Sequence, residues 1–358
     1  MSTDKERIIS TASNPVVRDF LRMADDSIVA ILPYALSVAA RLRIADECGG
    51  AGNDVETLAK RVNAEPDALQ RILRALASCG FFTESGNGRF ELTDLGDLLR
   101  SDSPNSMRAT LSNVDSYHAW LRAIDTISTG KPSFSNSFDA AFGAKFFSHK
   151  EEDDHAGASF DMRMQERSSR LYSGLETLPV WESVNSLIDV GGGNGAVLAS
   201  ILHANQNLLG TLFDRGDVIR RSETYGPLAP VNDRSQLVAG DFFTELPKGA
   251  DAHLFCSILH DWDDDKVIKI LNNSRRALTR NGKVIICEMI LPDLGEDHPA
   301  RWSDLGMMII GGRERTIGHY RRLARKANLR VSQIQQLPGS LFSVVELRRE
   351  DHMSPSAA

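Results

Sequence analysis

The sequence predicts an α/β fold, a doubly wound and mostly parallel sheet, with a separate helical domain ahead of it. The first indication is residues 186–195, Ser-Leu-Ile-Asp-Val-Gly-Gly-Gly-Asn-Gly, in which a short apolar strand runs directly into a glycine-rich turn. The second is that strand and helix patterns alternate from residue 186 onward, as in parallel βαβ units. Residues 14–100 instead show helical periodicity that ends in a hairpin. We therefore predict a Rossmann-like sheet in the second half of the chain.

The composition predicts an ordinary globular protein of two domains. The chain has 358 residues, of which 42% are apolar and 25% charged, and about 150 residues per domain is the usual prior. A net charge of −7 argues against binding to nucleic acid or to an anionic membrane. The polar start and the lack of any run near 18 apolar residues predict neither a signal segment nor a membrane span. Four scattered cysteines without C-x-x-C spacing indicate reduced thiols of a cytoplasmic protein, not disulfides or zinc ligands.

Residues 14–47 form the first predicted helical segment. Asn14-Pro15 supplies a cap followed by proline at the first helical position, and Pro33 is predicted to separate two helices. Positions 29–44 are more apolar than a solvated helix needs. Such a surface must be covered by the rest of its domain or by a second subunit, so we expect a homodimer.

Residues 53–100 show the pattern helix, turn, helix and hairpin. The second helix, from Pro66 to Cys79, places its apolar side chains on one face, and Ser85-Gly-Asn-Gly88 is a hairpin turn. This winged-helix pattern raises the alternative of a DNA-binding regulator. From residue 54 to the end of this stretch, six Lys and Arg face eight Asp and Glu, whereas DNA binding favours a basic surface. We therefore favour a structural role in dimer formation.

Residues 117–172 are predicted to be helical and are rich in aromatic side chains and methionine, including Phe160 and Met164. Two interpretations stay open: these side chains form a core, or some of them line a pocket for a flat, apolar substrate. The acidic run at 151–154 is predicted to be a solvated surface.

The glycine turn after the first predicted strand differs from a dinucleotide fingerprint. Its glycines have a G-x-G-x-G spacing that includes Gly191 and Gly193, and Asp189 stands just ahead of them. A carboxylate here would repel a pyrophosphate and attract a cation, which favours S-adenosylmethionine, with its sulfonium and ammonium groups, over NAD. The alternative is a tight turn that binds no ligand.

Acidic residues follow the next two predicted strands. Asp214 ends the strand at 209–213, the place where nucleotide-binding sheets hold a ribose diol. Asp241 follows the strand at 236–239 and could accept a hydrogen bond from an adenine amino group, with Phe242 against the ring. A plain turn is the alternative for this pair.

His260 follows the fourth predicted strand, 252–259, and Glu288 follows the fifth, 283–287. Both belong to the carboxyl edge of the sheet, where open α/β sheets bind ligands. A histidine with an ordinary pKa of about 6.5 takes up a proton at neutral pH, and a carboxylate on its other ring nitrogen would fix its tautomer. Glu288 and Glu314 are the candidates for that carboxylate. A structural histidine is the alternative, and a metal site is disfavoured because the neighbouring acids begin a helix and diverge.

The remaining segments complete the predicted fold. They are a helix capped by Asp263 and closed at Asn281-Gly282, a glycine turn after Met307 and Met308, a helix from Thr316 through Ala327, and a strand pair at 330–334 and 341–347. The predicted domains are an N-terminal helical and winged-helix dimerisation domain at 1–110, a helical linker with substrate-pocket residues at 111–178, a cofactor-binding domain at 179–350 and a disordered tail at 351–358.

Taken together, these motifs resemble the small-molecule O-methyltransferase family, typified by plant phenolic methyltransferases and bacterial polyketide-tailoring relatives. The resemblance covers roughly residues 15–350 and lies in the order and spacing of the motifs. It implies a class I methyltransferase sheet behind a dimerisation domain. It also implies methyl transfer from S-adenosylmethionine to an aromatic hydroxyl of a small molecule, with S-adenosylhomocysteine as product and no metal.

The resemblance also implies roles for individual residues. The histidine matching His260 is the family's general base, and the acids matching Glu288 and Glu314 flank it. The expected cofactor contacts are Asp189, Gly191, Gly193, Asp214, Asp241, Phe242 and Ser257. The expected substrate contacts are Phe160, Met164, Asp261, Met307 and Met308.

Two departures from the plant pattern favour the bacterial branch and a polyketide-type secondary metabolite, as in antibiotic biosynthesis. Cys256 stands where plant enzymes often have a lysine, and Ile309-Ile310 replaces an Asn-Pro pair before the glycine turn. Some members of that branch keep the fold and cofactor without transferring methyl. The presence of His260 with both candidate carboxylates argues against that fate here.

Two rival functions remain. An NAD-dependent oxidoreductase is disfavoured by Asp189, and a transcription regulator that senses S-adenosylmethionine is disfavoured by the acidic balance of residues 54–100. We expect a small aromatic substrate and a second copy of the chain as partners, and neither nucleic acid nor membrane.

Overall fold

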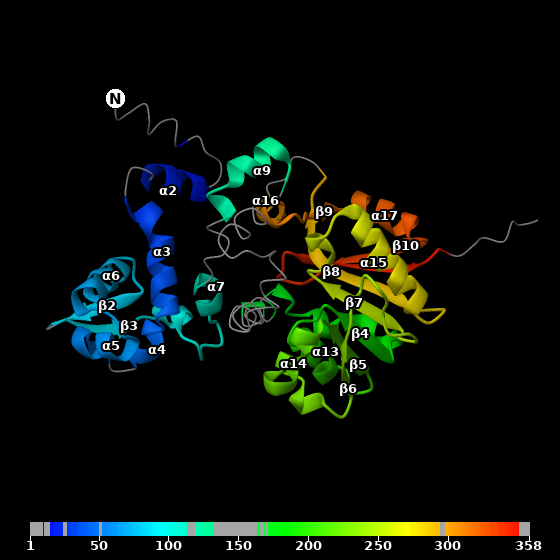
Figure 1. The fold of residues 1–358 in the computed structure, drawn as a ribbon, viewed down its shortest axis with the longest axis horizontal. Helices are drawn as coiled ribbons and strands as arrows, with labels where there is room; N and C mark the ends of the chain where they lie inside the picture. Colours follow the sequence, from blue (N-terminus) through cyan, green and yellow to red (C-terminus); the bar gives the residue numbers. More distant parts are fainter. Residues whose placement is uncertain are drawn as a thin grey trace, which may run out of the picture. The chain divides into compact units, whose positions relative to one another are not determined.

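The computed structural model describes residues 10, 15–23, 27–49, 52–86, 88–112, 119–131, 163–164, 168, 171–293 and 298–350. The chain divides into two compact units, Met1–Val114 and Asp115–Ala358 (Figure 1). The finer predicted division at residues 178 and 350 stays a prediction. Among the described residues, no helix is long and apolar enough to cross a membrane.

The first unit is a small helical domain with a three-stranded sheet of order β1-β3-β2. Its elements are α2 (Pro15–Met23), α3 (Ser27–Arg41), α4 (Ile44–Cys48), β1 (Asn53–Asp54), α5 (Val55–Val62), α6 (Pro66–Ser78), β2 (Phe82–Ser85), β3 (Arg89–Leu92), η1 (Gly96–Leu99) and α7 (Arg108–Ser112). The predicted helix pair and hairpin are confirmed, and their core includes Leu58, Leu73 and Phe90. The winged-helix class itself stays a prediction.

Pro33 does not separate two helices, so that prediction is wrong. It lies inside α3, although proline in a helix interior removes one backbone hydrogen bond. Ala35 and Ala39 on the same helix are buried in the core of the unit, and this packing keeps α3 continuous. The helix ends instead at Arg41, and Arg43, just before α4, has a left-handed φ of 56°.

Apolar side chains remain exposed on the helices α2 and α3. Val16 and Phe20 on α2 are 73% and 52% exposed, and Ile31 on α3 is 56% exposed. Solvated apolar surface of this extent favours coverage by another surface. The predicted cap residue Asn14 lies outside the described residues.

The second unit is a twisted sheet of order β10-β11-β8-β7-β4-β5-β6, with β9 paired to β8. Its elements are α9 (Ala123–Thr129), η2 (Leu175–Thr177), η3 (Pro179–Ser183), β4 (Ser186–Val190), α13 (Ala196–Ala204), β5 (Leu209–Asp214), α14 (Gly216–Tyr225), η4 (Ala229–Val231), β6 (Ser235–Ala239), β7 (Ala252–Cys256), η5 (Leu259–Asp261), α15 (Asp264–Ala277), β8 (Lys283–Leu291), α16 (Ala300–Ile310), β9 (Arg315–Thr316), α17 (Ile317–Lys326), β10 (Leu329–Gln336) and β11 (Phe342–Arg349).

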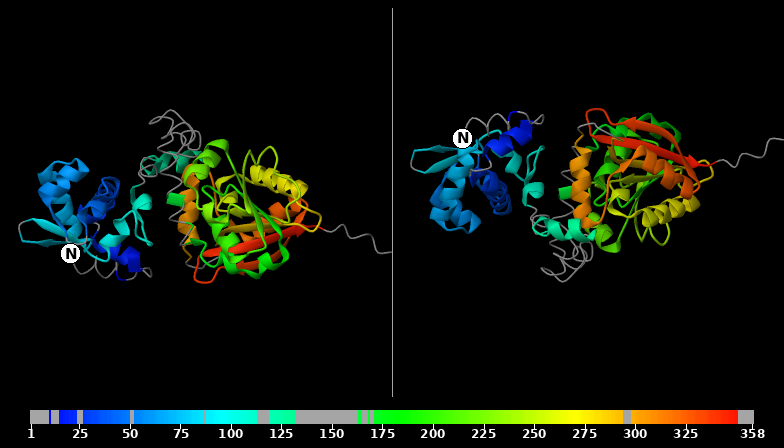
Figure 2. Two further views of the ribbon diagram at one scale, coloured as in Figure 1. Left: turned by 90° about the horizontal axis from the view of Figure 1, so that it is seen from below. Right: turned by 90° about the horizontal axis from the view of Figure 1, so that it is seen from above.

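The strand pairing confirms the predicted α/β sheet and locates its switch point. β4 pairs in parallel with β5 on one side and with β7 on the other, while β11 runs antiparallel to β8 and β10. The helices α13 and α14 cover one face of the sheet, and α15 and α17 cover the other (Figure 2). The strand order reverses at β4, so the carboxyl ends of β4 and β7 are where a ligand is expected.

Two predicted boundaries in this unit are wrong. The helix α15 ends at Ala277, not at Asn281-Gly282, because the intervening residues form a tight turn in which the Gly282 N–H donates to the Thr279 carbonyl. The strand β8 continues past Glu288 to Leu291, because it pairs with β11 and β9 beyond the end of β7. Glu288 is therefore inside a strand rather than after one.

Much of the predicted helical stretch at 117–172 lies outside the described residues. Phe160 and the acidic run at 151–154 fall there, as does the predicted disordered tail at 351–358. The described part contains α9, whose side chains pack with α16 around Ala119 and Ile309.

Candidate active site

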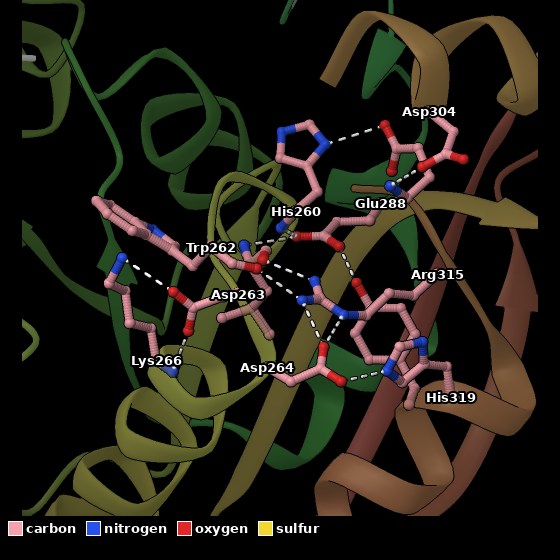
Figure 3. A network of polar contacts seen from close by, with 12 residues as sticks. His260, Trp262, Asp263, Asp264, Lys266, Glu288, Asp304, Arg315 and His319 are labelled. Carbon is pink, nitrogen blue, oxygen red and sulfur yellow. Dashed lines mark hydrogen bonds and ion pairs between the residues drawn. The ribbon is translucent and has the colours of Figure 1, made fainter. Parts of the chain in front are cut away.

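His260 lies in η5, just beyond the carboxyl end of β7 (Figure 3). Its Nδ1 is 3.1 Å from Glu314 Oε1, and both side chains are at least 90% buried. Because a carboxylate oxygen only accepts, Nδ1 carries the proton of this hydrogen bond. The second ring nitrogen, Nε2, lies 3.7 Å from Asp261 Oδ1, so a neutral His260 keeps an Nε2 lone pair for another group.

Glu288 supports the backbone of this turn and not the imidazole. Its Oε1 accepts the backbone N–H groups of Leu259 at 2.7 Å and His260 at 3.1 Å. The hydroxyl of Tyr320, a buried residue of α17, donates to Oε2. Of the two predicted carboxylate partners, only Glu314 contacts the ring.

Arg315 stabilises the same turn by donating hydrogen bonds to backbone carbonyl groups of the turn, a role that the sequence analysis did not predict. Its fully buried guanidinium donates to the carbonyl oxygens of Leu259 at 2.9 Å and Trp262 at 2.6 Å, and it pairs with Asp264 at 3.0 Å. In Figure 3 the His260 imidazole points away from Arg315 and Asp264. A single arginine within a charged triplet gives no signal of burial, because burial is decided by the fold.

The glycine turn at 311–312 brings Glu314 to the imidazole. The Arg313 N–H donates to the His260 carbonyl at 2.8 Å. A Cβ on Gly312 would lie 2.2 Å from that same carbonyl oxygen, closer than any side chain can approach. Glycine is therefore required at this position for the two backbones to meet.

Electrostatics around His260 differ from the predicted ordinary histidine. Burial by itself would lower its pKa, but the hydrogen bond to Glu314 and the negative charges of Asp261, Glu288 and Glu314 outweigh it and raise the pKa of His260 to about 9. The expectation of a pKa of about 6.5 is therefore wrong, and the imidazole is mostly protonated at pH 7. Burial also raises the pKa of Glu288.

In the glycine turn after β4, the backbone lies close to the side chains of Ile258 and Asp214. Gly191 has a φ of 73°, and a Cβ there would lie 2.6 Å from the Ile258 side chain, so both conformation and space require glycine. Gly193, with a φ of 61°, faces open space. Its N–H donates to Asp214 Oδ2 at 2.9 Å, which ties the turn to the end of β5.

Asp189 is a buried carboxylate beside this turn. It is 1% exposed, and neither of its oxygens has a hydrogen-bond partner within the described part of the chain. Burial, and then the charge of Asp214, raise the pKa of Asp189 to about 7. An unpaired buried anion is costly, and a cationic ligand would stabilise it. This fits S-adenosylmethionine, since the molecule carries two positive groups.

Asp241 and Phe242 occupy the turn after β6. The Asp241 carboxylate accepts from the Phe243 N–H at 2.8 Å and the Thr244 hydroxyl at 3.0 Å, so it stabilises its own turn, and its contact with an adenine amino group stays a prediction. The Phe242 ring packs edge-on against Trp262 at 6.0 Å between centroids. Trp262 thus links this turn to the His260 segment, a contact that sequence reasoning did not find.

The other predicted contacts lie at scattered positions. Ser257 has a left-handed φ of 52°, and its hydroxyl bonds to the Tyr172 hydroxyl. Met307 and Met308 lie half-buried in the last turn of α16, and Met308 packs on the small cluster around Ala119. Met164 is half-buried. No cluster of three or more metal-ligating side chains is found in the described ranges.

Family comparisons match both units. The family model of the O-methyltransferase domain matches residues 120–330, and that of the O-methyltransferase dimerisation domain matches residues 28–102.

Individual relatives agree with these matches. The chain is 34% identical over 320 residues to phenazine O-methyltransferase PhzM of Lysobacter antibioticus, covering 88% of this chain and 92% of the relative. It is 32% identical over 345 residues to aclacinomycin 10-hydroxylase RdmB of Streptomyces purpurascens, covering 92% and 90%. The crystal structure of NcsB1, an O-methyltransferase from neocarzinostatin biosynthesis in complex with S-adenosylmethionine and 2-hydroxy-5-methyl naphthoic acid, superposes with a TM-score of 0.77 at 30% identity, covering 89% and 96%.

The resemblance inferred from the motifs is thereby confirmed. The chain belongs to the O-methyltransferase family as an S-adenosylmethionine-dependent enzyme, with a dimerisation domain followed by a class I methyltransferase domain.

Proposed function

We propose that the chain methylates a phenolic hydroxyl of an aromatic, polyketide-type secondary metabolite, with His260 as the general base. The observation that carries the proposal is the Nδ1 contact of His260 with Glu314 at 3.1 Å, because in the neutral imidazole it leaves Nε2 as the proton acceptor. Relatives named as phenazine and dihydroxynaphthoate O-methyltransferases support an aromatic acceptor.

The electrostatics of His260 suit the removal of a phenolic proton. A free phenol has a pKa of about 10, and the imidazole of this chain has a pKa of about 9. Proton transfer between groups about one pKa unit apart is nearly balanced, whereas an ordinary imidazole would face a gap of about 3.5 units. The carboxylate of Glu314 stabilises the imidazolium that forms. S-adenosylmethionine, when bound, supplies a methyl group on a positively charged sulfur.

We assign the remaining contacts as follows. Asp189 would face a positive group of the cofactor, and Asp214, held on the Gly193 N–H, would hold its ribose. Asp261, 3.7 Å from Nε2, would lie beside the acceptor hydroxyl. The half-buried methionines Met164, Met307 and Met308, with Phe160, would pack on the acceptor ring.

Substitution of the base tests the proposal. His260→Ala is expected to lose at least about a hundredfold in kcat with a phenolic acceptor, while calorimetry shows unchanged affinity for S-adenosylhomocysteine. The matched control is His203→Ala, which changes an exposed histidine on α13 and should leave kcat intact. Full activity of His260→Ala would overturn the base assignment.

The hydroxylase relative supports a second candidate, a chain that keeps the fold and cofactor without transferring methyl. Product analysis with S-adenosylmethionine labelled in its methyl group separates the two. Label in the aromatic product supports methyl transfer, and an unlabelled hydroxylated product supports the alternative.

We infer a homodimer that forms through the first unit. Residues 28–102 match the family model of a dimerisation domain, and the helices α2 and α3 expose apolar side chains. Light scattering of the full chain tests this. The four cysteines are free, which supports a reducing compartment such as the cytoplasm.

A further inference from the structure

Ser303 makes a contact that its place in α16 does not require. A serine inside a helix commonly turns its hydroxyl back to a carbonyl oxygen of the preceding turn. The Ser303 hydroxyl instead donates to Glu314 Oε1 across 2.7 Å, and this is the oxygen that accepts from His260 Nδ1. One carboxylate oxygen therefore receives two hydrogen bonds.

The second oxygen of Glu314 receives none from the residues that the structure describes, although it is buried. The two oxygens of a carboxylate are chemically equivalent, so His260 by itself does not select one of them or fix the plane of the group. The hydrogen bond from Ser303 to Oε1 is a second restraint on the orientation of the carboxylate. The Glu314 N–H also donates to Asp304 Oδ1 at 2.9 Å, so adjacent residues of α16 hold both the side chain and the backbone of Glu314.

We propose that Ser303 is a positioning residue, which fixes the Glu314 carboxylate against His260 Nδ1 and so keeps Nε2 directed at the acceptor hydroxyl. This rests on the proposed role of His260 as base. The same helix carries Met307, whose terminal methyl lies against Gly312. The helix that we expect to contact the acceptor is therefore also the helix that orients the base.

A kinetic comparison tests this role. Ser303→Ala is expected to lower kcat about tenfold, the rate equivalent of one modest hydrogen bond, with unchanged acceptor KM and unchanged affinity for S-adenosylhomocysteine. Ser303→Thr keeps a hydroxyl and should restore most of kcat. The matched control is Ser332→Ala, which removes a serine hydroxyl from another buried carboxylate, Glu346, at 2.8 Å. Equal losses in both alanine variants would overturn the proposal, as would failure of the threonine variant.

Coupling to Glu314 gives a second readout. In a Glu314→Ala background, Ser303→Ala should cause no further loss of kcat, because the side chain that Ser303 positions is gone. Losses that multiply would contradict the proposal.

A third readout needs neither cofactor nor turnover. Besides Glu314, the groups that face His260 are Asp261 and Glu288, and Ser303→Ala leaves both in place. NMR titration of the His260 ring in the ligand-free chain should show a lower midpoint in Ser303→Ala and no change in Ser332→Ala. An unchanged midpoint would overturn the positioning role. If the midpoint falls but the wild-type chain methylates no phenol, only the proposed function fails.

Discussion

One buried carboxylate lies beside the turn after β4 and another beside the turn that carries His260, but the two differ in their hydrogen bonds. Asp189 has no hydrogen-bond partner among the described residues, whereas Glu288 accepts from two backbone N–H groups and one tyrosine hydroxyl. A satisfied carboxylate fixes the chain's own geometry. An unsatisfied one stores an unfavourable charge that a cationic ligand can relieve. The first turn therefore leaves a charge that a cationic ligand could neutralise, as we propose, and the second is complete without a ligand.

The largest effect is expected for Glu288, the carboxylate whose hydrogen bonds are made within the chain. Glu288→Leu leaves the N–H groups of Leu259 and His260 and the Tyr320 hydroxyl buried without an acceptor, at about 1–3 kcal/mol for each group. We expect the free energy of unfolding to fall by about 3–5 kcal/mol, measured by urea denaturation. Glu288→Gln keeps one accepting oxygen and should lose clearly less. Equal stability of Glu288→Leu and the wild-type chain would break the comparison.

The second prediction concerns the pH dependence of the His260 turn. With a pKa of about 9, about one imidazole in a hundred is neutral at pH 7. Turnover should therefore rise about fiftyfold from pH 7 to pH 9, where about half of the imidazoles are neutral, measured as kcat/KM for the acceptor. Glu314→Gln removes a cause of the raised pKa and should move the midpoint to lower pH. A wild-type profile that is flat above pH 7 would contradict the assignment.

The same raised pKa has a consequence for stability, with the opposite sign. A group that binds its proton more tightly in the folded chain stabilises the fold at low pH. The contribution of His260 is fully present below about pH 6.5 and is lost as the pH rises through about 9.

The third prediction concerns Asp189, the buried carboxylate without a hydrogen-bond partner among the described residues. The pKa of Asp189 is raised to about 7, so its ionisation costs stability increasingly between its unfolded pKa of about 4 and pH 7. Affinity for S-adenosylmethionine should rise by about tenfold between pH 6 and pH 8 as the carboxylate ionises, measured by calorimetry. Asp189→Asn should remove this dependence while stabilising the ligand-free chain at pH 8. A variant that binds as the wild type does at both pH values would show that Asp189 does not face a cation.

The smallest effect is expected at the exposed edge of the His260 turn. Lys266 pairs with Asp263 at 3.0 Å and lies 5.4 Å from the centre of the Trp262 ring, but both partners of the ion pair are more than half exposed. Solvent screens such a pair. Lys266→Ala should change the free energy of unfolding by less than about 1 kcal/mol and leave kcat unchanged. A larger loss would mean that the turn depends on its outer surface as well as on Glu288.

Local sequence patterns were sufficient to predict a residue's structural role where that role depends only on its neighbours in the chain. The glycines at 191 and 193 follow an apolar strand, Asp263 caps its helix as predicted, and Thr316, predicted to begin a helix, is the cap of that helix. Pro33 shows the limit of such patterns, because its effect on α3 depends on what packs against the helix. The segment at 117–172 shows another limit, since its aromatic composition fits a core and a pocket equally well.

The sequence by itself determined the order of strands and helices, the acid before the glycine turn and the histidine beyond β7, because each follows from periodicity and residue type within a short window. Only the tertiary structure decided which carboxylate meets the imidazole. Glu288 and Glu314 are equally good candidates by charge, but their partners come from α17, α16 and η5, which are distant in the chain. The burial of Arg315 and the raised pKa of His260 have the same origin, because both depend on which groups the folded chain brings together and shields from water.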